Sequence, residues 1–157
     1  MEMIRAQSPD EIDDARRLFR EYEAFLDVDL CFQDFEAELA SLPGKYGGPE
    51  GELLLAYEAD HAVGCVALRR LEDGVCEMKR LFVRPAARGR GLGRQLAEEI
   101  VRAACELGYA TMRLDTLERL EGAMHLYEGL GFRRIGAYYD NPLAEVAYFE
   151  ADLYSSS

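Results

Sequence analysis

One segment organises the chain: Val83-Arg84-Pro85-Ala86-Ala87-Arg88-Gly89-Arg90-Gly91-Leu92-Gly93-Arg94. It leaves an apolar strand, passes through a basic, glycine-rich loop and enters a long amphipathic helix. Its closely spaced glycines let backbone N–H groups approach a ligand, and the first turn of a helix leaves N–H donors without intrahelical partners. Those donors, the positive end of the helix dipole and the arginines of the segment favour an anion. We therefore interpret this segment as a binding loop for a pyrophosphate.

Two better-known phosphate loops do not match this spacing. A dinucleotide fingerprint counted from Gly89 needs a third glycine where Arg94 stands. A nucleotide-triphosphate loop needs Ser or Thr after Gly-Lys, but Gly44-Lys45 is followed by Tyr46. Spacing excludes both of these sites. An ordinary glycine-rich turn before a helix remains as the alternative to a binding loop.

The pattern that does match is Arg-x-x-Gly-x-Gly from Arg88 to Gly93, which resembles the coenzyme A pyrophosphate loop of the GNAT superfamily of N-acetyltransferases. A second stretch, from Ala123 to Phe132, reads AMHLYEGLGF and is similar to the leucine-tyrosine, variable, glycine-phenylalanine stretch of that superfamily. The order of the expected elements also fits, so the resemblance covers nearly the whole chain. It implies acetyl-CoA as co-substrate and an amine as acceptor.

Length and composition indicate a globular protein. A chain of 157 residues suits one domain, and we assign 1–154 to a single acetyltransferase domain and the serines at 155–157 to a disordered tail. No run approaches the roughly 20 apolar residues that span a bilayer, and the acidic N-terminus lacks a signal-peptide pattern. We therefore expect a cytoplasmic protein with no membrane partner.

The net charge of −12 makes binding to nucleic acid unfavourable, because phosphate is repelled overall. The charge is uneven, since the segment 69–94 has eight basic residues against three acidic ones. A basic cofactor slot in an acidic body would attract a polyphosphate at one place and a cation elsewhere. Acidity that serves solubility alone is the alternative.

The four cysteines do not indicate a metal site. Cys31, Cys65, Cys76 and Cys105 are widely spaced and form no C-x-x-C pair. The last three lie in apolar stretches, where we expect reduced core residues. We expect no metal and no catalytic cysteine.

The pattern of apolar residues predicts the elements of the fold. Strands are predicted at 2–7, 52–59, 62–70, 75–83, 110–116, 132–137 and 146–153. Helices are predicted from the capping box Ser8-Pro9-Asp10-Glu11 to residue 26 and at 33–41, 92–107 and 121–129. This order places helices on a mixed sheet, an α/β (α+β) fold. The resemblance implies a mostly antiparallel, twisted sheet in which 75–83 and 110–116 are a splayed central pair of parallel strands.

Glu77 lies in the predicted strand 75–83, where a carboxylate is expensive to bury unless it is paired or functional. It matches the strand glutamate that serves several GNAT members as general base, directly or through water. An alkylammonium group has a pKa of about 10.4, so a carboxylate would help to position the amine and pass on its proton. The alternative is a structural pair of Glu77 with Arg80 or Arg113.

Tyr127 lies in the predicted helix 121–129 and matches the superfamily tyrosine that acts as general acid toward the coenzyme A sulfur. A phenol of pKa about 10 can protonate a departing thiolate, whose thiol has a pKa of about 8.5, while staying neutral at rest. A core tyrosine with its hydroxyl at the surface is the alternative. His125 points to a different side of the helix and His61 lies in a predicted turn, so we expect neither to take part.

The resemblance also implies the remaining contacts of coenzyme A. Backbone N–H groups at Leu81, Phe82 and Val83 would stabilise the oxyanion and hold the pantetheine arm, if a bulge frees them from the ladder. The far wall of the slot would be Thr116, Ala123 and Tyr127. The residues that would hold the diphosphate are Arg88, Gly89, Arg90, Gly91, Leu92, Gly93 and Arg94.

The sequence gives fewer signals for the acceptor site than for the cofactor site. We expect its walls in the first two helices, their link and the closing loop 138–142, with the candidates Tyr22, Asp27, Asp29, Phe32 and Phe35. Acidic and aromatic residues together suit a cationic amine, on a small molecule or a peptide. Packing of the aromatics in the core or at a homodimer contact is the alternative.

The sequence is also compatible with other functions of the same fold. A non-catalytic acyl-CoA-binding sensor or interaction module would keep the loop but would have less reason to keep both Glu77 and Tyr127. An enzyme that transfers a longer acyl chain, or that acts on a hydroxyl group, would differ only in the shape of its acyl pocket.

Overall fold

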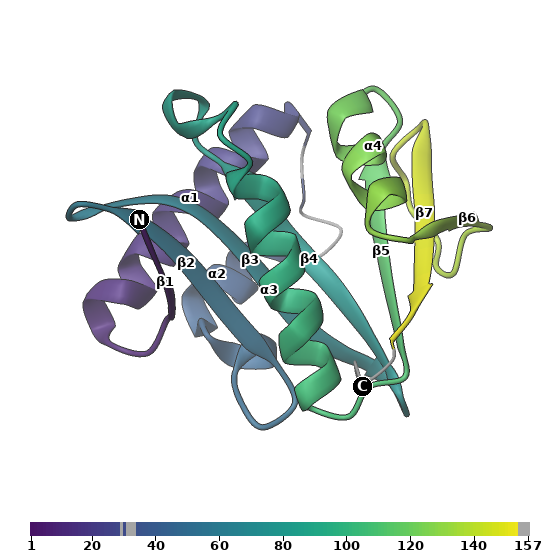
Figure 1. Cartoon of the computed structure of the whole chain (residues 1–157), viewed down its shortest axis with the longest axis horizontal. Coiled ribbons are helices and arrows are strands. Elements are labelled where there is room, and N and C mark those ends of the chain that lie inside the picture. The colour runs from purple at the N-terminus through teal and green to yellow at the C-terminus, as the bar shows by residue number, and fades with distance from the viewer. Residues whose placement is uncertain (29, 31–33, 154–157) are drawn as a thin grey trace.

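The computed structural model describes residues 1–28, 30 and 34–153, in which seven strands form one sheet in the order β1-β2-β3-β4-β5-β7-β6 (Figure 1). Neighbouring strands are antiparallel except for β4 and β5. The strands are β1 (Glu2–Arg5), β2 (Glu52–Glu58), β3 (His61–Glu72), β4 (Val75–Val83), β5 (Thr111–Leu117), β6 (Arg133–Ile135) and β7 (Val146–Asp152). The helices are α1 (Pro9–Leu26), α2 (Phe35–Ser41), α3 (Leu92–Glu106) and α4 (Glu121–Gly129), with 3-10 turns at Gly44–Tyr46 and Pro85–Ala87.

Local sequence signals account for these elements. Their order is the predicted one, and Ser8 and Glu11 form the expected capping box at the start of α1. The strand predicted at 132–137 is shorter, because the chain leaves the sheet after Ile135 and carries Tyr138 toward β4. Cys31 and the serines at 155–157 lie outside the described residues.

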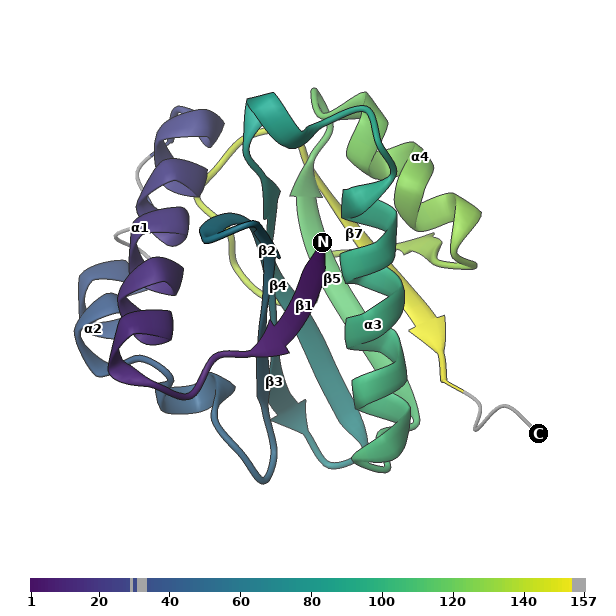
Figure 2. The ribbon, with the colours of Figure 1, turned by 60° about the vertical axis from the view of Figure 1, so that its left-hand side comes forward.

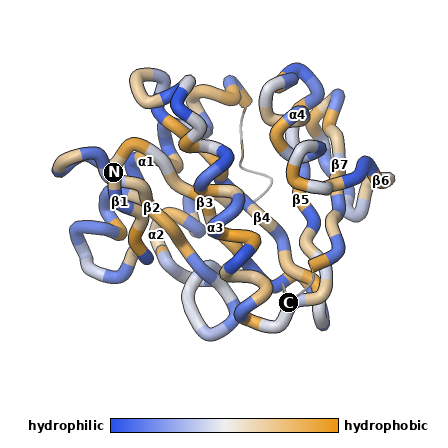
Figure 3. The backbone as a smooth tube through the Cα atoms, in the orientation of Figure 1, coloured by the Kyte–Doolittle hydropathy of each residue, from blue (hydrophilic) through white to orange (hydrophobic). Residues whose placement is uncertain are grey.

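Helices cover both faces of the sheet. Figure 2 shows α1 and α2 on one side and α3 and α4 on the other. Val66 and Leu68 of β3 belong to the core under α3, whereas Cys65 and Ala67 belong to the core under α1 and α2. Because successive side chains of a strand leave opposite faces, β3 must be apolar at nearly every position in its middle. Along α3, Figure 3 shows hydrophobic and hydrophilic stretches in turn, as expected of a helix with one buried side.

β4 and β5 are paired along only part of their length. The parallel register runs from Val75 opposite Thr111 to Glu77 opposite Arg113 and stops there. β4 continues beside β3 and β5 continues beside β7, so the two strands part after Glu77 (Figure 1). The predicted splay is confirmed.

β4 also carries a bulge in the parted stretch. Between Lys79 and Phe82 the register with β3 slips, because β4 has two residues, Arg80 and Leu81, against one on β3. A bulge bends the strand and re-aims its side chains. Arg80 has a φ of 62°, a left-handed conformation that is uncommon for a residue other than glycine.

Regular pairing resumes after the bulge and sets the direction of the next amides. The Arg84 N–H donates to the Val63 carbonyl of β3 at 2.8 Å. Backbone groups alternate in direction along a strand, so those of Val83 point away from β3 and toward the gap beside β5. The end of β4 therefore presents an N–H group to the space between the parted strands.

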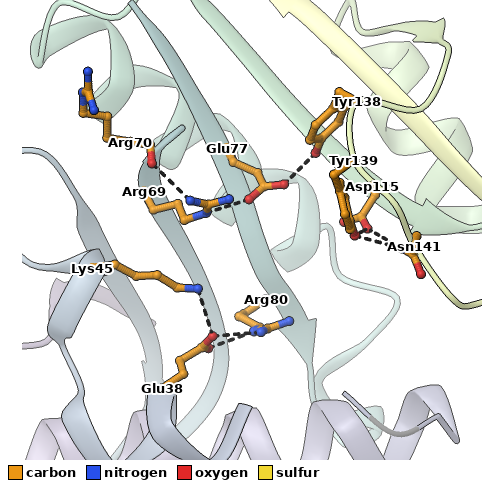
Figure 4. A network of polar contacts seen from close by, with 10 residues as sticks. All are labelled: Glu38, Lys45, Arg69, Arg70, Glu77, Arg80, Asp115, Tyr138, Tyr139 and Asn141. Carbon is orange, nitrogen blue, oxygen red and sulfur yellow. Dashed lines mark hydrogen bonds and ion pairs between the residues drawn. The ribbon is translucent and has the colours of Figure 1, made fainter. Parts of the chain in front are cut away.

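A buried ion pair holds the bulge on the face of the sheet that α1 and α2 cover. The Arg80 side chain donates from Nε and Nη2 to the two carboxylate oxygens of Glu38 on α2, at 2.9 Å each (Figure 4). Glu38 is 8% exposed and Arg80 is 3% exposed. Burial raises the pKa of Glu38, but Arg80 and Lys45 outweigh that effect and lower the pKa overall. The pair is therefore ionised at neutral pH and ties α2 to β4.

We predict that Glu38→Ala strongly destabilises the protein, because it leaves the Arg80 charge buried without its carboxylate. Removing one partner of a buried pair costs about 3 to 5 kcal/mol. Glu36→Ala on the same helix is the matched control, since Glu36 pairs with Arg20 at the surface, where a pair contributes about 0 to 1 kcal/mol. Urea unfolding measures both variants, and equal losses of unfolding free energy would contradict the prediction.

Candidate active site

The glycine-rich loop ends in an open row of backbone amides at the start of α3. Gly89 and Gly91 have φ angles of 83° and 78°, which glycine adopts without strain, and Gly91 caps the helix. Within the described part of the chain, no backbone N–H from Gly89 to Arg94 donates to another backbone group. A Cβ atom at Gly89 or Gly91 would meet nothing within 4 Å, so the space beside these residues is open. Such a row of donors at a helix N-terminus fits the diphosphate of coenzyme A.

The four arginines of this loop all contact other groups of the protein. Their partners are Glu21 for Arg84, the Val83 carbonyl and the Phe25 ring for Arg88, Glu58 for Arg90 and Glu98 for Arg94. Half or more of the Arg90 and Arg94 side chains is nevertheless exposed. The open amides and the exposed parts of Arg90 and Arg94 are therefore the groups of this loop that can still bind an anion.

A narrow cleft lies between the parted strands. Leu81 of β4, Thr116 of β5 and Tyr127 of α4 line it, as expected for the cofactor slot. Phe82 points to the opposite face, where its ring is buried beside α1, and its amide faces β3. Ala123 packs against the core under α3 and α4 and is not part of the cleft lining. The structure therefore brings Leu81 and Val83, rather than Phe82, to the gap.

Tyr127 is fixed at the wall of this cleft by aromatic packing. Its side chain is 7% exposed, and its ring centroid lies 6.0 Å from that of Phe132 and 6.1 Å from that of Phe149. Burial raises the pKa of the Tyr127 hydroxyl above its usual value. The hydroxyl therefore keeps its proton at neutral pH, as a general acid must before it donates.

Glu77 is 1% exposed and is engaged at both carboxylate oxygens (Figure 4). One oxygen accepts from Arg69 Nε at 2.8 Å and the other from the Tyr138 hydroxyl at 2.6 Å. Burial raises the pKa of Glu77, but Lys79, Arg69 and these hydrogen bonds lower it overall. Glu77 is therefore a carboxylate at neutral pH.

The predicted structural partners of Glu77 are wrong. Arg80 binds Glu38, and Arg113 binds Glu72 and Glu150, while Arg69 of β3 occupies the place beside Glu77. The reason is the register: Arg69 lies directly opposite Glu77 in the antiparallel pair of β3 and β4. Cross-strand neighbours on one face are close enough to pair.

The loop between β6 and β7 closes against the same region. Tyr138 reaches Glu77, while Tyr139 and Asn141 donate to Asp115 of β5 (Figure 4). The Tyr138, Tyr139 and Tyr148 rings pack together with centroids 5.4 to 5.8 Å apart. The loop is therefore held over the sheet by both hydrogen bonds and ring contacts.

The residues expected at the acceptor site lie in different parts of the structure. Tyr22 lines the cleft, whereas Phe35 is 1% exposed and lies in the core under Arg80. Asp27 ends α1 at an exposed position, and Asp29 and Phe32 lie outside the described residues. Of the closing loop, Tyr138, Tyr139 and Asp140 line a pocket beside Glu77.

Sequence reasoning missed the cationic residues of this pocket, which are Lys45, Arg69, Lys79 and Arg113. Lys79 could have been found, because alternation along a strand places it on the same face as Glu77. Arg69 could not have been found in this way, because a regular turn at Asp73-Gly74 would place Arg70 opposite Glu77, and the register shift between Arg70 and Glu72 brings Arg69 there instead.

The histidines and the described cysteines line neither the cleft nor the pocket beside Glu77. His61 and His125 are exposed, and Cys65 and Cys76 are buried free thiols. Burial raises the pKa of Cys76 to about 12, so the thiol is not a ready nucleophile. Among the described residues, no group of three or more His, Cys, Asp or Glu side chains could hold a metal ion. None of the helices in the described ranges is long and apolar enough to cross a membrane.

Comparison with known proteins identifies the family. The model of the acetyltransferase (GNAT) family matches residues 12–132. An uncharacterized N-acetyltransferase of Schizosaccharomyces pombe is 43% identical over 147 residues, which cover 92% of this chain and 90% of the relative.

Solved structures share the fold. An acetyltransferase from Streptococcus agalactiae superposes with a TM-score of 0.80 at 25% identity, over 97% of this chain and 98% of that one. A GNAT family acetyltransferase from Elizabethkingia anophelis, solved with acetyl-CoA bound, superposes with a TM-score of 0.58 at 24% identity, over 66% of this chain and 77% of that one. Since the family match covers well over half of the sequence, the chain belongs to the GNAT family of acetyltransferases.

Proposed function

We propose that this protein transfers the acetyl group of acetyl-CoA to a primary amine by direct attack of the amine in a ternary complex. The observation that carries the proposal is the open row of amides from Gly89 to Arg94, which follows β4 where that strand has parted from β5. Family membership and the acetyl-CoA held by the Elizabethkingia anophelis protein support it. Acetyl-CoA would supply the activated acetyl group as a thioester.

The loop and the gap would position this co-substrate. The amides from Gly89 to Arg94 would hold the diphosphate, with Arg88, Arg90 and Arg94 balancing its charge. The gap beside β4 would take the pantetheine arm. Because the Val83 N–H points into the gap, it would donate to the oxyanion that develops during transfer, and a donor already in place needs no reorganisation.

Two side chains would move protons. Tyr127 at the cleft wall would protonate the departing sulfur, for which its raised pKa keeps it protonated. Glu77 would orient the ammonium group and accept its proton, directly or through water. Each Glu77 oxygen accepts one hydrogen bond in the structure, and an ionised carboxylate has about four lone-pair sites, so it can accept another.

A non-catalytic acyl-CoA-binding sensor is the second candidate. The engagement of both Glu77 oxygens by Arg69 and Tyr138 favours it, since a structural pair needs no acceptor amine. Thiol release separates the two functions. An enzyme releases coenzyme A thiol and yields acetylated amine, whereas a sensor binds acetyl-CoA and releases no thiol with any amine.

We predict that Gly91→Glu abolishes acetyl-CoA binding, because the new side chain would enter the open space of the loop and place a negative charge beside the diphosphate. Calorimetric titration with acetyl-CoA measures the loss. Gly74→Glu is the matched control: Gly74 also has a positive φ, 75°, and an unobstructed Cβ position, but it lies in the turn between β3 and β4. Unchanged affinity in Gly91→Glu would remove the loop from the proposed site.

We predict that Tyr127→Phe lowers kcat by about 100-fold or more, the usual contribution of a general acid, while the Kd for acetyl-CoA changes little. Thiol release with a panel of amines, and mass detection of the acetylated product, measure the effect. Tyr109→Phe is the control, since the Tyr109 hydroxyl donates to the Glu50 carbonyl away from the cleft. Equal turnover of the Tyr127 variant and the wild type would reduce Tyr127 to a packing residue.

We predict that Glu77→Gln moves the pH profile of kcat/KM to higher pH. The lowered pKa of Glu77 keeps the carboxylate ionised at neutral pH, and it is lost only as the pH falls through that lowered value. Without the carboxylate, the acceptor must lose its proton unaided, and a free alkylamine does so near pH 10. Glu52→Gln is the control, because Glu52 is a strand glutamate that pairs with Arg5 far from the cleft. An unchanged profile would assign the proton transfer to another group.

A further inference from the structure

A pocket lies beside the cleft, on the face of the sheet that α1 and α2 cover. It encloses about 460 Å³, within the range of about 300 to 1,000 Å³ that is usual for small-molecule sites. Its wall comes from β3, β4, β5, the N-cap of α2, the 3-10 turn that contains Lys45, and the loop between β6 and β7. Lys79 lines both this pocket and the cleft, so the two spaces meet at that side chain. The pocket and the cleft are therefore adjacent, with Lys79 between them.

The inner wall of this pocket contains two arginines with unused donors. Arg69 donates from Nε and Nη1, to Glu77 and to the Arg70 carbonyl. Arg113 donates from Nε and Nη1, to Glu150 and Glu72. A guanidinium group has five N–H donors, and the Nη2 group of neither arginine bonds to any residue that the structure describes. Both arginines can still bind an anionic ligand.

The carboxylates nearby are bound to these cations or lie at the rim of the pocket. Glu77 binds Arg69 and Tyr138, and Arg113 binds both Glu72 and Glu150, the second of which it shares with Arg133. The acidic side chains of the wall other than Glu77, at positions 34, 72 and 140, lie at exposed positions. Salt screens exposed charges more than buried ones, so the interior of the pocket is more positive than its rim.

Lys79 adds to the positive interior. Its side chain is 8% exposed, and burial, followed by the nearby Arg80 charge, lowers its pKa to about 8. Lys45 and the two arginines line the same pocket, so a second ammonium group on an acceptor would meet four cationic side chains. A carboxylate would meet complementary charge.

We propose that the acceptor is a small amine that also carries a carboxylate, which Arg69 and Arg113 bind while the amine points past Lys79 toward the cleft. This inference rests on the proposed acetyl transfer and names the class of its acceptor. It refines the cationic amine expected from the sequence, since the ammonium group remains and a carboxylate is added. Arginine suits this role because its planar fork matches the two oxygens of a carboxylate.

The test compares matched amines: ω-amino acids with spacers of one to four carbons, their primary amides and the diamines of the same length. Thiol release from acetyl-CoA, with mass detection of the product, gives kcat/KM for each. For at least one spacer length we expect kcat/KM for the ω-amino acid to exceed kcat/KM for its primary amide by about tenfold or more, as a charge-assisted hydrogen bond would produce. If the amides or the diamines have the same kcat/KM as the ω-amino acids at every spacer length, this inference is overturned and the proposed acetyl transfer is unaffected. If no amine causes thiol release, the proposed function is overturned, and this inference with it.

Variants assign the effect to the pocket. Arg113→Gln is expected to remove most of the preference for the carboxylate, chiefly through a higher KM, and Arg113→Lys is expected to keep part of it. Arg133→Gln is the matched control, because Arg133 binds the same Glu150 at 2.9 Å but does not line the pocket. Thermal melting checks that each variant is folded. A preference that survives in folded Arg113→Gln, or that falls equally in Arg133→Gln, would overturn the assignment.

Discussion

The short pairing of β4 with β5 is the constraint on which the rest of the structure depends. The two parallel strands share a register only from Val75 to Glu77, and each is then held by its other neighbour, β3 or β7. The sheet therefore opens in its middle without losing either strand. Backbone groups that a regular ladder would occupy, such as those of Val83, face the gap instead. Because the glycine loop follows directly from the end of β4, its open amides lie at the same end of the molecule as the gap.

The face of the sheet opposite α3 contains buried ion pairs where a core would ordinarily be apolar. Glu38 with Arg80 and Glu77 with Arg69 form buried or half-buried pairs within one short stretch of β4 and its neighbours. Such pairs are a weak source of stability, because the loss of hydration offsets most of the attraction between the charges. They do specify the geometry closely. The Glu38 pair holds an arginine in a left-handed conformation at the bulge, and the Glu77 pair sets the floor of the pocket next to the cleft.

A protonated hydroxyl and a carboxylate lie in adjacent spaces, since Tyr127 lines the cleft and Glu77 lines the pocket beside it. Tyr127 keeps its proton because it is buried among apolar rings, while Glu77 is ionised because cations and hydrogen bonds outweigh the effect of burial. A neutral acid and a charged carboxylate in these two spaces suit the proposed reaction, in which an amine would lose a proton and a thiolate would gain one.

The elements, their order and the glycine loop can be predicted from the amino-acid sequence, because capping, turns and the period of apolar residues are local signals. The sequence also indicated Glu77 and Tyr127 as candidates through residue type and the resemblance of short motifs. Three features required the folded chain: Arg69 rather than Arg80 or Arg113 binds Glu77, Phe82 turns away from the gap, and the closing loop reaches β4 and β5 through Tyr138 and Tyr139. These outcomes depend on strand register, on the bulge at Arg80 and on contacts between residues far apart in the chain. No local pattern encodes them, because each is the result of how separate elements pack against one another.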